Sequence, residues 1–266
     1  MFPFVHLPQY GLIVCSECQH AVLPSHVDTH LGDKKRHDMP KESRDGIIQE
    51  IFNRIGIDSR TFVEFGVGDG LENNTLKLLL EGWQGLWIEG NAKSVAGIET
   101  RFRDIIASGK LHVQCAFVER DNINSLIEGY VSGEIDLLSI DIDGNDIYVL
   151  EAVTVVKPRV IVVEYNGKFR PPISVAQQYN PTQQWSGTDY FGSSLAAITK
   201  AAARKGYSLV GCGIVGVNAF FVRNDLVGDH FHSPFTAENH FQPARYFLTQ
   251  LFHSGHTQDW GVYEQV

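Results

Sequence analysis

The sequence predicts an α/β fold in which a mostly parallel sheet carries helices on both faces. From about residue 44 onward, short apolar runs alternate with amphipathic helical segments, as expected for strands that are buried on both sides. Near the end of the chain, two such runs are joined by only a glycine-rich turn. So short a connection permits an antiparallel pair but no helical crossover. We therefore expect seven strands, with the last one antiparallel.

The expected elements follow one another after a domain boundary near residues 40–43. A stripe of Ile47, Ile48, Ile51, Phe52 and Ile55 predicts the first helix. The expected strands are 61–65, 86–89, 111–118, 135–142, 159–164, 207–212 and 217–222. Further helices are expected at 75–81, 92–107, 122–130, 147–155 and 193–205. The remaining stretch, 166–192, is a long insert without predicted secondary structure; because such loops usually cover binding sites, we interpret it as the substrate wall.

Composition and charge limit the classes of function. Hydrophobic residues make up 43% of the 266 residues, which is typical of a globular protein, and the formal charge of −9 argues against binding to nucleic acid or an anionic membrane. No apolar run could span a bilayer and the N-terminus lacks a secretory signal, so we expect a cytoplasmic protein. Cys115 and Cys212 lie in apolar runs and are expected to be buried thiols.

A glycine-rich loop is the strongest local signal of function. In Glu64-Phe65-Gly66-Val67-Gly68-Asp69-Gly70 a strand runs directly into alternating glycines, which allow a tight turn and the close approach of a ligand. About twenty residues later, Glu89 ends the next strand, where a carboxylate can accept hydrogen bonds from the two hydroxyls of a ribose. Together, the loop and the acid indicate a cofactor that contains a nucleoside.

The spacing of the glycines favours S-adenosylmethionine (SAM) over a dinucleotide. Dinucleotide loops favour G-x-G-x-x-G, and here the third glycine arrives one residue early. Glu64, two positions before the first glycine, can bind a positively charged amino acid group, which SAM has and NAD lacks. The loop resembles motif I of class I SAM-dependent methyltransferases, with Glu89 as the acid of their motif II.

The resemblance continues along most of the chain, from about Arg44 to Gly255. The segments are Phe62-Val63-Glu64-Phe65-Gly66, Glu72-Asn73-Asn74-Thr75, Gly85-Leu86-Trp87-Ile88-Glu89-Gly90, Ser139-Ile140-Asp141-Ile142-Asp143-Gly144-Asn145-Asp146, Val163-Glu164-Tyr165-Asn166 and Gly216-Val217-Asn218-Ala219-Phe220-Phe221-Val222. They are similar to an FkbM-like group of methyltransferases. The resemblance implies the Rossmann-like class I fold and assigns Asp141 to the motif IV position. The residues that we assign to the cofactor are Glu64, Gly66, Gly68, Gly70, Asn74, Glu89, Phe117 and Asp141.

A second group of acidic residues lies where two neighbouring strands end. Asp141 and Asp143 lie at the end of the fourth strand and Glu164 ends the fifth, so all three should meet at the ligand-binding edge of the sheet. One carboxylate could act as a general base, or the group could hold Mg²⁺, Mn²⁺ or Ca²⁺, which prefer oxygen ligands. The side chains could also simply cap the helix and contact the methionine part of SAM. For catalysis we choose Asp143, Glu164 and Asn166.

The first forty residues contain a pattern of metal ligands. Cys15 and Cys18 are followed by His30 and His37, and two thiolates with two imidazoles make a tetrahedral zinc site. The gap from His30 to His37 exceeds the usual three to five residues, and His26 with His30 is an alternative histidine pair. The segment resembles a C2H2-like finger of fungal proteins of unknown function. We therefore divide the chain into a zinc-binding segment, 1–42, and a methyltransferase-like domain, 43–266.

The sequence as a whole predicts an enzyme that transfers the SAM methyl group to an oxygen or nitrogen of a small-molecule acceptor. Two alternatives remain open: an NAD(P)-dependent oxidoreductase, and a non-catalytic protein that binds SAM and interacts through its zinc finger.

Overall fold

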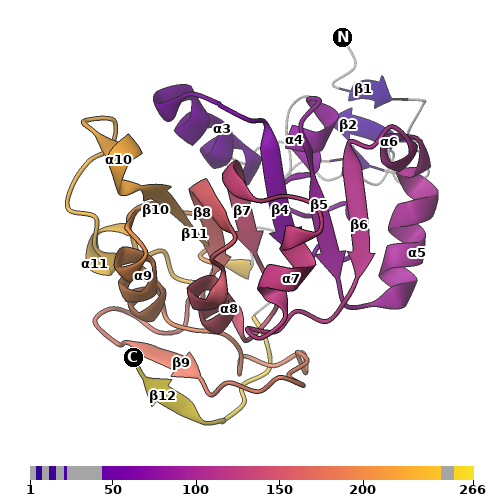
Figure 1. Ribbon diagram of the computed structural model, residues 1–266. Coiled ribbons are helices and arrows are strands. Elements are labelled where there is room, and N and C mark those ends of the chain that lie inside the picture. Colours follow the sequence, from indigo (N-terminus) through magenta and orange to yellow (C-terminus); the bar gives the residue numbers. More distant parts are fainter. Residues whose placement is uncertain (1–3, 8–11, 16–20, 23–43, 247–254) are drawn as a thin grey trace.

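The computed structural model describes residues 4–7, 12–15, 21–22, 44–246 and 255–266. Its centre is a seven-stranded sheet (Figure 1) with strand order β10-β11-β8-β7-β4-β5-β6. All strands run parallel except β11, which is antiparallel to both neighbours. The strands are β4 (Thr61–Phe65), β5 (Gln84–Glu89), β6 (Leu111–Cys115), β7 (Gly133–Ile140), β8 (Val156–Glu164), β10 (Tyr207–Cys212) and β11 (Asn218–Arg223). The expected Rossmann-like methyltransferase fold is confirmed.

Helices cover both faces of the sheet. One face, called here the α3 face, carries α3 (Arg44–Ile55), α4 (Leu76–Leu80), α5 (Ala92–Arg101), α6 (Arg103–Ala107) and α10 (Asn224–Val227). The other, the α8 face, carries α7 (Ile123–Glu128), α8 (Asp146–Ala152), α9 (Leu195–Arg204) and α11 (Ala237–His240). In Figure 1, α7, α8 and α9 lie in front of the strands.

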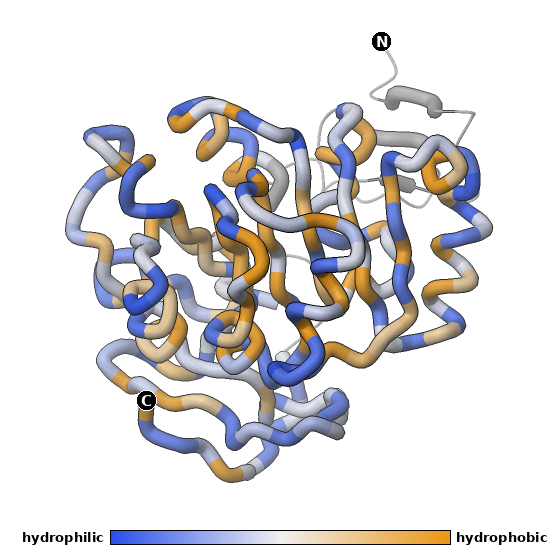
Figure 2. Tube along the Cα trace, viewed as in Figure 1, coloured by the Kyte–Doolittle hydropathy of each residue, from blue (hydrophilic) through white to orange (hydrophobic). Residues whose placement is uncertain are grey.

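Two hydrophobic cores follow from the alternation of side chains along each strand. In β4, Phe62 packs into the core of the α3 face and Val63 into the core of the α8 face. Both side chains are fully buried. The same alternation continues through β7 and β8, and the hydrophobic residues concentrate in the central strands (Figure 2). Because helices cover both faces of the sheet, polar side chains can gather only where the strands end. A ligand site is therefore restricted to those ends.

The helix expected over 92–107 is divided into α5 and α6, which meet at Phe102. The Phe102 ring is fully buried and packs edge-on against Trp87, with ring centroids 5.2 Å apart. Asn91 starts α5, because its side chain accepts hydrogen bonds from the backbone amides of Lys93 and Ser94. The helix α5 therefore begins three residues after Glu89, the last residue of β5.

The insert was expected to have no secondary structure, and this expectation is wrong. It contains β9 (Val175–Gln177), which pairs antiparallel with β12 (Tyr263–Gln265) at the end of the chain. An isolated bridge also joins Thr188 to Thr257. In Figure 1 the two strands β9 and β12 lie below α8 and α9. The insert and the C-terminal residues therefore form one wall.

The N-terminal part has three short strands, β1 (Phe4–Leu7), β2 (Leu12–Cys15) and β3 (Ala21–Val22), in the order β1-β2-β3. Cys15 ends β2, whereas Cys18, His26, His30, His37 and the boundary at 40–43 lie outside the described residues. None of the helices described is long and apolar enough to cross a membrane.

The expectation of two buried thiols is only partly met. Cys115 is exposed and Cys212 is partly buried. Each is the last residue of a strand at one edge of the sheet, β6 and β10, beyond which no described strand pairs with it. An apolar run predicts a strand, but it does not indicate whether that strand lies at the edge or in the centre.

Candidate functional site

The glycine loop lies at the point where the order of the strands reverses. β4 is flanked by β5 and β7, and ligands of open α/β sheets bind at the carboxyl ends of such strands. Gly66 has φ +72°, and a Cβ there would lie 1.6 Å from the carbonyl oxygen of Asp141. Its amide donates to the carbonyl of Ile88 at 3.0 Å. Only glycine can occupy this position, which joins the ends of β4, β5 and β7.

Glu89 holds the loop and the start of α5 together. Its Oε2 accepts from the Gly68 amide and its Oε1 from the Asn91 amide, both at 2.8 Å. The side chain is partly exposed, and a carboxylate has about four acceptor positions, so two remain for a ligand. The Phe117 ring is 40% exposed and lies next to Gly90, where a Cβ would be 3.2 Å from it. A fixed carboxylate beside an exposed aromatic ring suits the ribose and the planar base of a nucleoside.

Glu64 has a different environment from the one that its expected role requires. It is 2% exposed. Its carboxylate accepts from the Asn74 amide at 2.8 Å, the Thr75 amide at 3.1 Å, the Thr75 hydroxyl at 2.5 Å and the Ser139 hydroxyl at 3.0 Å. Burial raises the pKa of Glu64, and these hydrogen bonds act in the opposite direction. Protein donors fill its acceptor positions, so its geometry suits fixing the chain before α4 rather than contacting a ligand.

Two other cofactor candidates also face the protein interior. Asn74 is 1% exposed, and its Nδ2 donates to the Ser139 hydroxyl at 2.9 Å. Gly70 has φ +77° and packs against Trp87 and Phe102, where a Cβ would approach their rings to 3.0 and 3.2 Å. Both residues shape the loop from beneath, whereas Gly66, Gly68 and Glu89 form its outer side.

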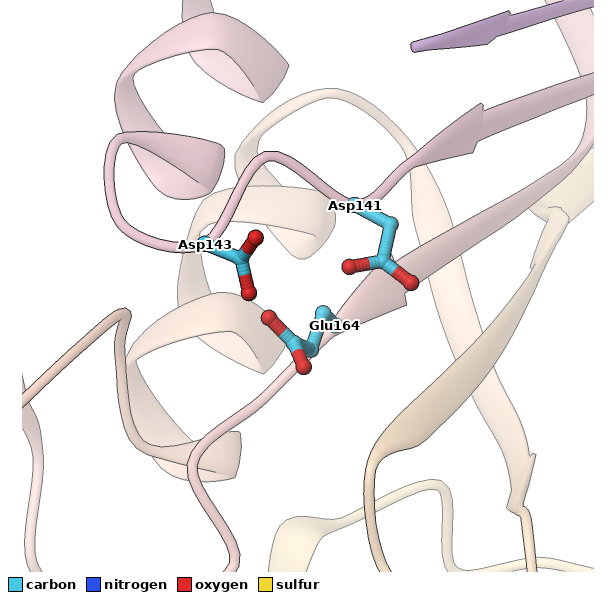
Figure 3. A group of neighbouring side chains, drawn as sticks. All are labelled: Asp141, Asp143 and Glu164. Atoms are coloured by element: carbon cyan, nitrogen blue, oxygen red, sulfur yellow. The ribbon is translucent and has the colours of Figure 1, made fainter. Parts of the chain in front are cut away.

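Three carboxylates meet at the neighbouring strand ends (Figure 3). Asp141 and Asp143 follow β7 and Glu164 ends β8; one oxygen of each lies within 4.8 Å of one oxygen of the other two. All three side chains are partly buried and point toward the same space. Burial raises the pKa of Asp143, and the negative charge of Glu89 raises it further. The structure therefore brings together the acids that the sequence placed at this edge.

Asp146 supports this group from inside. It is fully buried and accepts from the amides of Ile142 and Gly144, at 2.9 and 2.8 Å. Burial raises its pKa to about 6, against the effect of those hydrogen bonds. Asp143, between the two donors, has φ +56°, in the left-handed region that few residues other than glycine adopt. Asp146 fixes the loop that carries Asp143.

Asn166, the third catalytic candidate, uses its side chain to hold the insert. Its Nδ2 donates to the carbonyls of Asp189 and Phe191, both at 3.0 Å, and its Oδ1 accepts from the Lys168 amide at 3.1 Å. It is 3% exposed. The side-chain atoms are thus occupied by protein partners, and Asn166 positions the insert.

Sequence reasoning missed an aromatic group beside the acids. The His256 ring lies between Trp185, Phe191 and Tyr246, with centroid distances of 4.9, 5.9 and 4.6 Å. Burial raises the pKa of Tyr246 to about 12, and the charge of Glu164 adds to the rise. This group combines the insert with the C-terminal residues, which are about 60 positions apart, and no local pattern could have indicated it.

Comparison with known proteins gives a match for the first part of the chain and structural neighbours for the rest. A family model described as "Orsellinic acid/F9775 biosynthesis cluster protein D" matches residues 3–65. No curated protein sequence matches the chain.

Solved structures similar to the chain include three SAM-dependent methyltransferases. Magnesium protoporphyrin IX methyltransferase from Synechocystis PCC 6803, with bound SAM, is 13% identical with a TM-score of 0.44, over 76% of this chain and 85% of that chain. A SAM-dependent methyltransferase from Clostridium acetobutylicum is 13% identical with a TM-score of 0.44, over 75% and 98%. CalS10, an amino pentose methyltransferase from Micromonospora echinaspora with bound SAM, is 10% identical with a TM-score of 0.45, over 74% and 96%.

Proposed function

We propose that the chain is a SAM-dependent methyltransferase that acts on an oxygen or nitrogen of a small-molecule acceptor, and that it belongs to the FkbM-like group. The observation that carries this proposal is the position of Glu89. Its carboxylate bridges the glycine loop and the start of α5 at the switch point of the sheet, with acceptor positions left over. The fit of a nucleoside rests on this carboxylate, on Phe117 and on the outer side of the loop at Gly66 and Gly68.

The chain's own residues divide into cofactor and acceptor positions. Glu89 would accept the ribose hydroxyls and Phe117 would contact the adenine, while Asp141 lies next to Gly66, on the side toward the acids. When bound, SAM supplies an electrophilic methyl group whose bond to sulfur breaks as the new bond forms. Asp143 or Glu164 would take the proton that the acceptor loses, and a raised pKa makes Asp143 a better base.

Isothermal titration calorimetry with SAM and with NADH tests the proposal directly. We expect binding of SAM at micromolar concentration and no heat with NADH. Clear heat with NADH and none with SAM would contradict the methyltransferase proposal. Mass spectrometry of small molecules carried through purification would identify the bound cofactor independently of any assay.

We further propose that residues 1–42 form a zinc-binding segment that precedes a methyltransferase domain at 43–266. Cys15, Cys18, His30 and His37 would be the ligands, with His26 as the alternative to His37. The support is the spacing of thiol and imidazole groups. Elemental analysis should give one zinc per chain, which Cys15→Ser should remove without changing the affinity for SAM. Zinc retained in that variant would contradict the ligand set.

A further inference from the structure

A buried amide next to the three carboxylates has no partner within the described part of the protein. Asn218 is 1% exposed, and neither its Oδ1 nor its Nδ2 has a hydrogen-bond partner among the described residues. Most buried polar side chains in proteins are hydrogen-bonded, and an unsatisfied one calls for an explanation. A bound cation, which takes oxygen ligands, would account for the unpaired Oδ1.

The pairing of β11 with β8 places Asn218 beside the acids. Asn218 lies directly opposite Glu164 in the antiparallel pair, so both side chains project from the same face of the sheet. Opposed residues of such a pair have Cβ atoms about 4.5–5.5 Å apart. Asn218 therefore lies beside Glu164, which is one of the three acids that Figure 3 shows.

We propose that Asp141, Asp143, Glu164 and the side-chain oxygen of Asn218 bind one divalent cation that prefers oxygen ligands, Mg²⁺ or Mn²⁺. The spacing of the carboxylates suits such an ion. Metal–oxygen distances of about 2.1 Å place neighbouring ligand oxygens about 3 Å apart and opposite ones about 4 Å apart. The three carboxylate oxygens lie within 4.8 Å of one another, so small rotations of the side chains complete the geometry.

The chemistry of the donors selects the ion. The proposed ligands are three carboxylates and one amide oxygen, with no thiolate or imidazole among them. Sites made of oxygen ligands alone favour Mg²⁺, Mn²⁺ or Ca²⁺ over zinc. Three neighbouring carboxylates also repel one another, and a divalent cation offsets that repulsion. The cation site is therefore distinct from the proposed zinc ligands of residues 1–42.

The role of the ion rests on the proposed function. A cation at these four residues would bind an acceptor hydroxyl and lower its pKa, which favours an oxygen acceptor over an amine. The hydroxyl proton would leave to the second oxygen of one of the carboxylates. The new oxygen–carbon bond would then form as the carbon–sulfur bond of SAM breaks.

The test is a titration of the full chain with Mn²⁺ alone, after treatment with a chelator and without SAM. Electron paramagnetic resonance reports free Mn²⁺, and we expect one bound ion per chain that excess Mg²⁺ displaces. Asp143→Asn and Asn218→Leu should each weaken binding of Mn²⁺ by about tenfold or more. Asp189→Asn is the matched control: it removes a neighbouring charge that is not a ligand and should change the affinity by less than about threefold.

Asn218→Leu separates a ligand from a merely buried amide. Replacing an unpaired buried amide by a hydrocarbon of similar size should leave the metal-free protein as stable as the wild type, so failure to fold is not expected. If that variant does not fold, Asn218→Asp, which keeps an oxygen ligand, should fold and retain the affinity for Mn²⁺. The inference is overturned if the wild type binds no Mn²⁺, if Asn218→Leu binds it as tightly as the wild type, or if Asp189→Asn loses as much affinity as Asp143→Asn.

A titration of the same samples with SAM keeps this inference separate from the proposed function. Binding of Mn²⁺ without binding of SAM would support the proposed cation site and contradict the proposed methyltransferase function. Binding of SAM without binding of Mn²⁺ would support the proposed function and contradict the cation site.

Discussion

The two halves of the carboxyl edge of the sheet differ in how their polar groups are satisfied. At β4 and β5, the Glu64 carboxylate has four protein donors and Glu89 has two backbone amides. At β7, β8 and β11, three carboxylates face one another, and the Asn218 amide lacks a hydrogen bond within the described part of the chain. The first half is organised by protein donors alone, whereas on our proposal a bound cation would satisfy the Asn218 oxygen and balance the charges of the second half.

This difference fits a division of labour between affinity and chemistry. A site whose groups are already held in place loses little entropy when its ligand binds, and this favours tight binding of a cofactor. Carboxylates close to one another and partly buried have raised pKa values, as Asp143 does, which suits proton transfer. Substitutions confined to one half should therefore change cofactor affinity or methyl transfer separately.

The largest effect on stability is expected at Gly66, which joins the two halves. Gly66→Ala places a Cβ against the carbonyl of Asp141 and should destabilise the fold by about 3–5 kcal/mol. Gly68→Ala is the control, because it has a positive φ of 56° but nothing within 4 Å of its Cβ, so it should cost about 1–2 kcal/mol. Urea unfolding measures both. Equal losses would mean that backbone strain, and not the close approach, sets the requirement for glycine.

The second prediction concerns the acids of β7 and β8. Glu164→Gln and Asp143→Asn should lower methyl transfer by about 10²–10⁴, the range for loss of a general base, and leave the affinity for SAM unchanged. Turnover is measured with labelled SAM, on an acceptor found by mass spectrometry of cell extract. Wild-type turnover in both variants would assign this cluster a structural role.

The third prediction compares Glu89 with Glu64 within the first half. Glu89→Ala should weaken SAM binding by about 1.5–3 kcal/mol, because hydrogen bonds to a charged group are lost. Glu64→Gln should instead lower the free energy of unfolding by about 1–3 kcal/mol, because the amide cannot accept from all four donors. Calorimetry and urea unfolding of both variants give the answer. A large loss of SAM affinity and an unchanged stability in Glu64→Gln would restore the direct contact expected from the sequence.

The sequence predicted the order and type of the strands well because that information is local. The run of residues 61–70 contains both the strand and the glycines of the turn, and Glu89 follows from its distance to them. Asp141, Asp143 and Glu164 could be placed together because parallel strands end at the same edge. These inferences needed only the period of the apolar residues and the topology of an α/β sheet.

What the sequence could not provide depends on contacts between distant residues. β9 is three residues long and its partner β12 begins 86 positions after the end of β9, so no pattern indicated the pair. Glu64 is the next-to-last residue of β4 and Glu89 the last residue of β5, and both accept two or more hydrogen bonds, yet only the packing of Thr75 and Ser139 around Glu64 distinguishes their roles. The orphaned amide of Asn218 became evident from its burial and its register with Glu164.

The effect that is spread over the widest pH range is a dependence of stability on pH that Asp146 should cause. Burial raises its pKa to about 6 in the folded protein, from a value near 4 in the unfolded chain. Between these values the folded state binds the proton more tightly, so this contribution to stability is present below about pH 4 and is lost as the pH rises through about 6. The loss should be on the order of 3 kcal/mol.

Asp146→Asn isolates this contribution, because the amide does not titrate. The side-chain nitrogen of the asparagine would face one of the two backbone amides that donate hydrogen bonds to Asp146. The variant should therefore be less stable at every pH. Its stability should nevertheless fall less than that of the wild type between about pH 4 and about pH 7, when urea unfolding is compared at both. Asp143 and Glu64, whose pKa values are also raised, contribute the same sign to both proteins, so only the difference between the two slopes reports Asp146. Identical slopes would mean that Asp146 stays ionised across this range, held by the two backbone amides despite its burial.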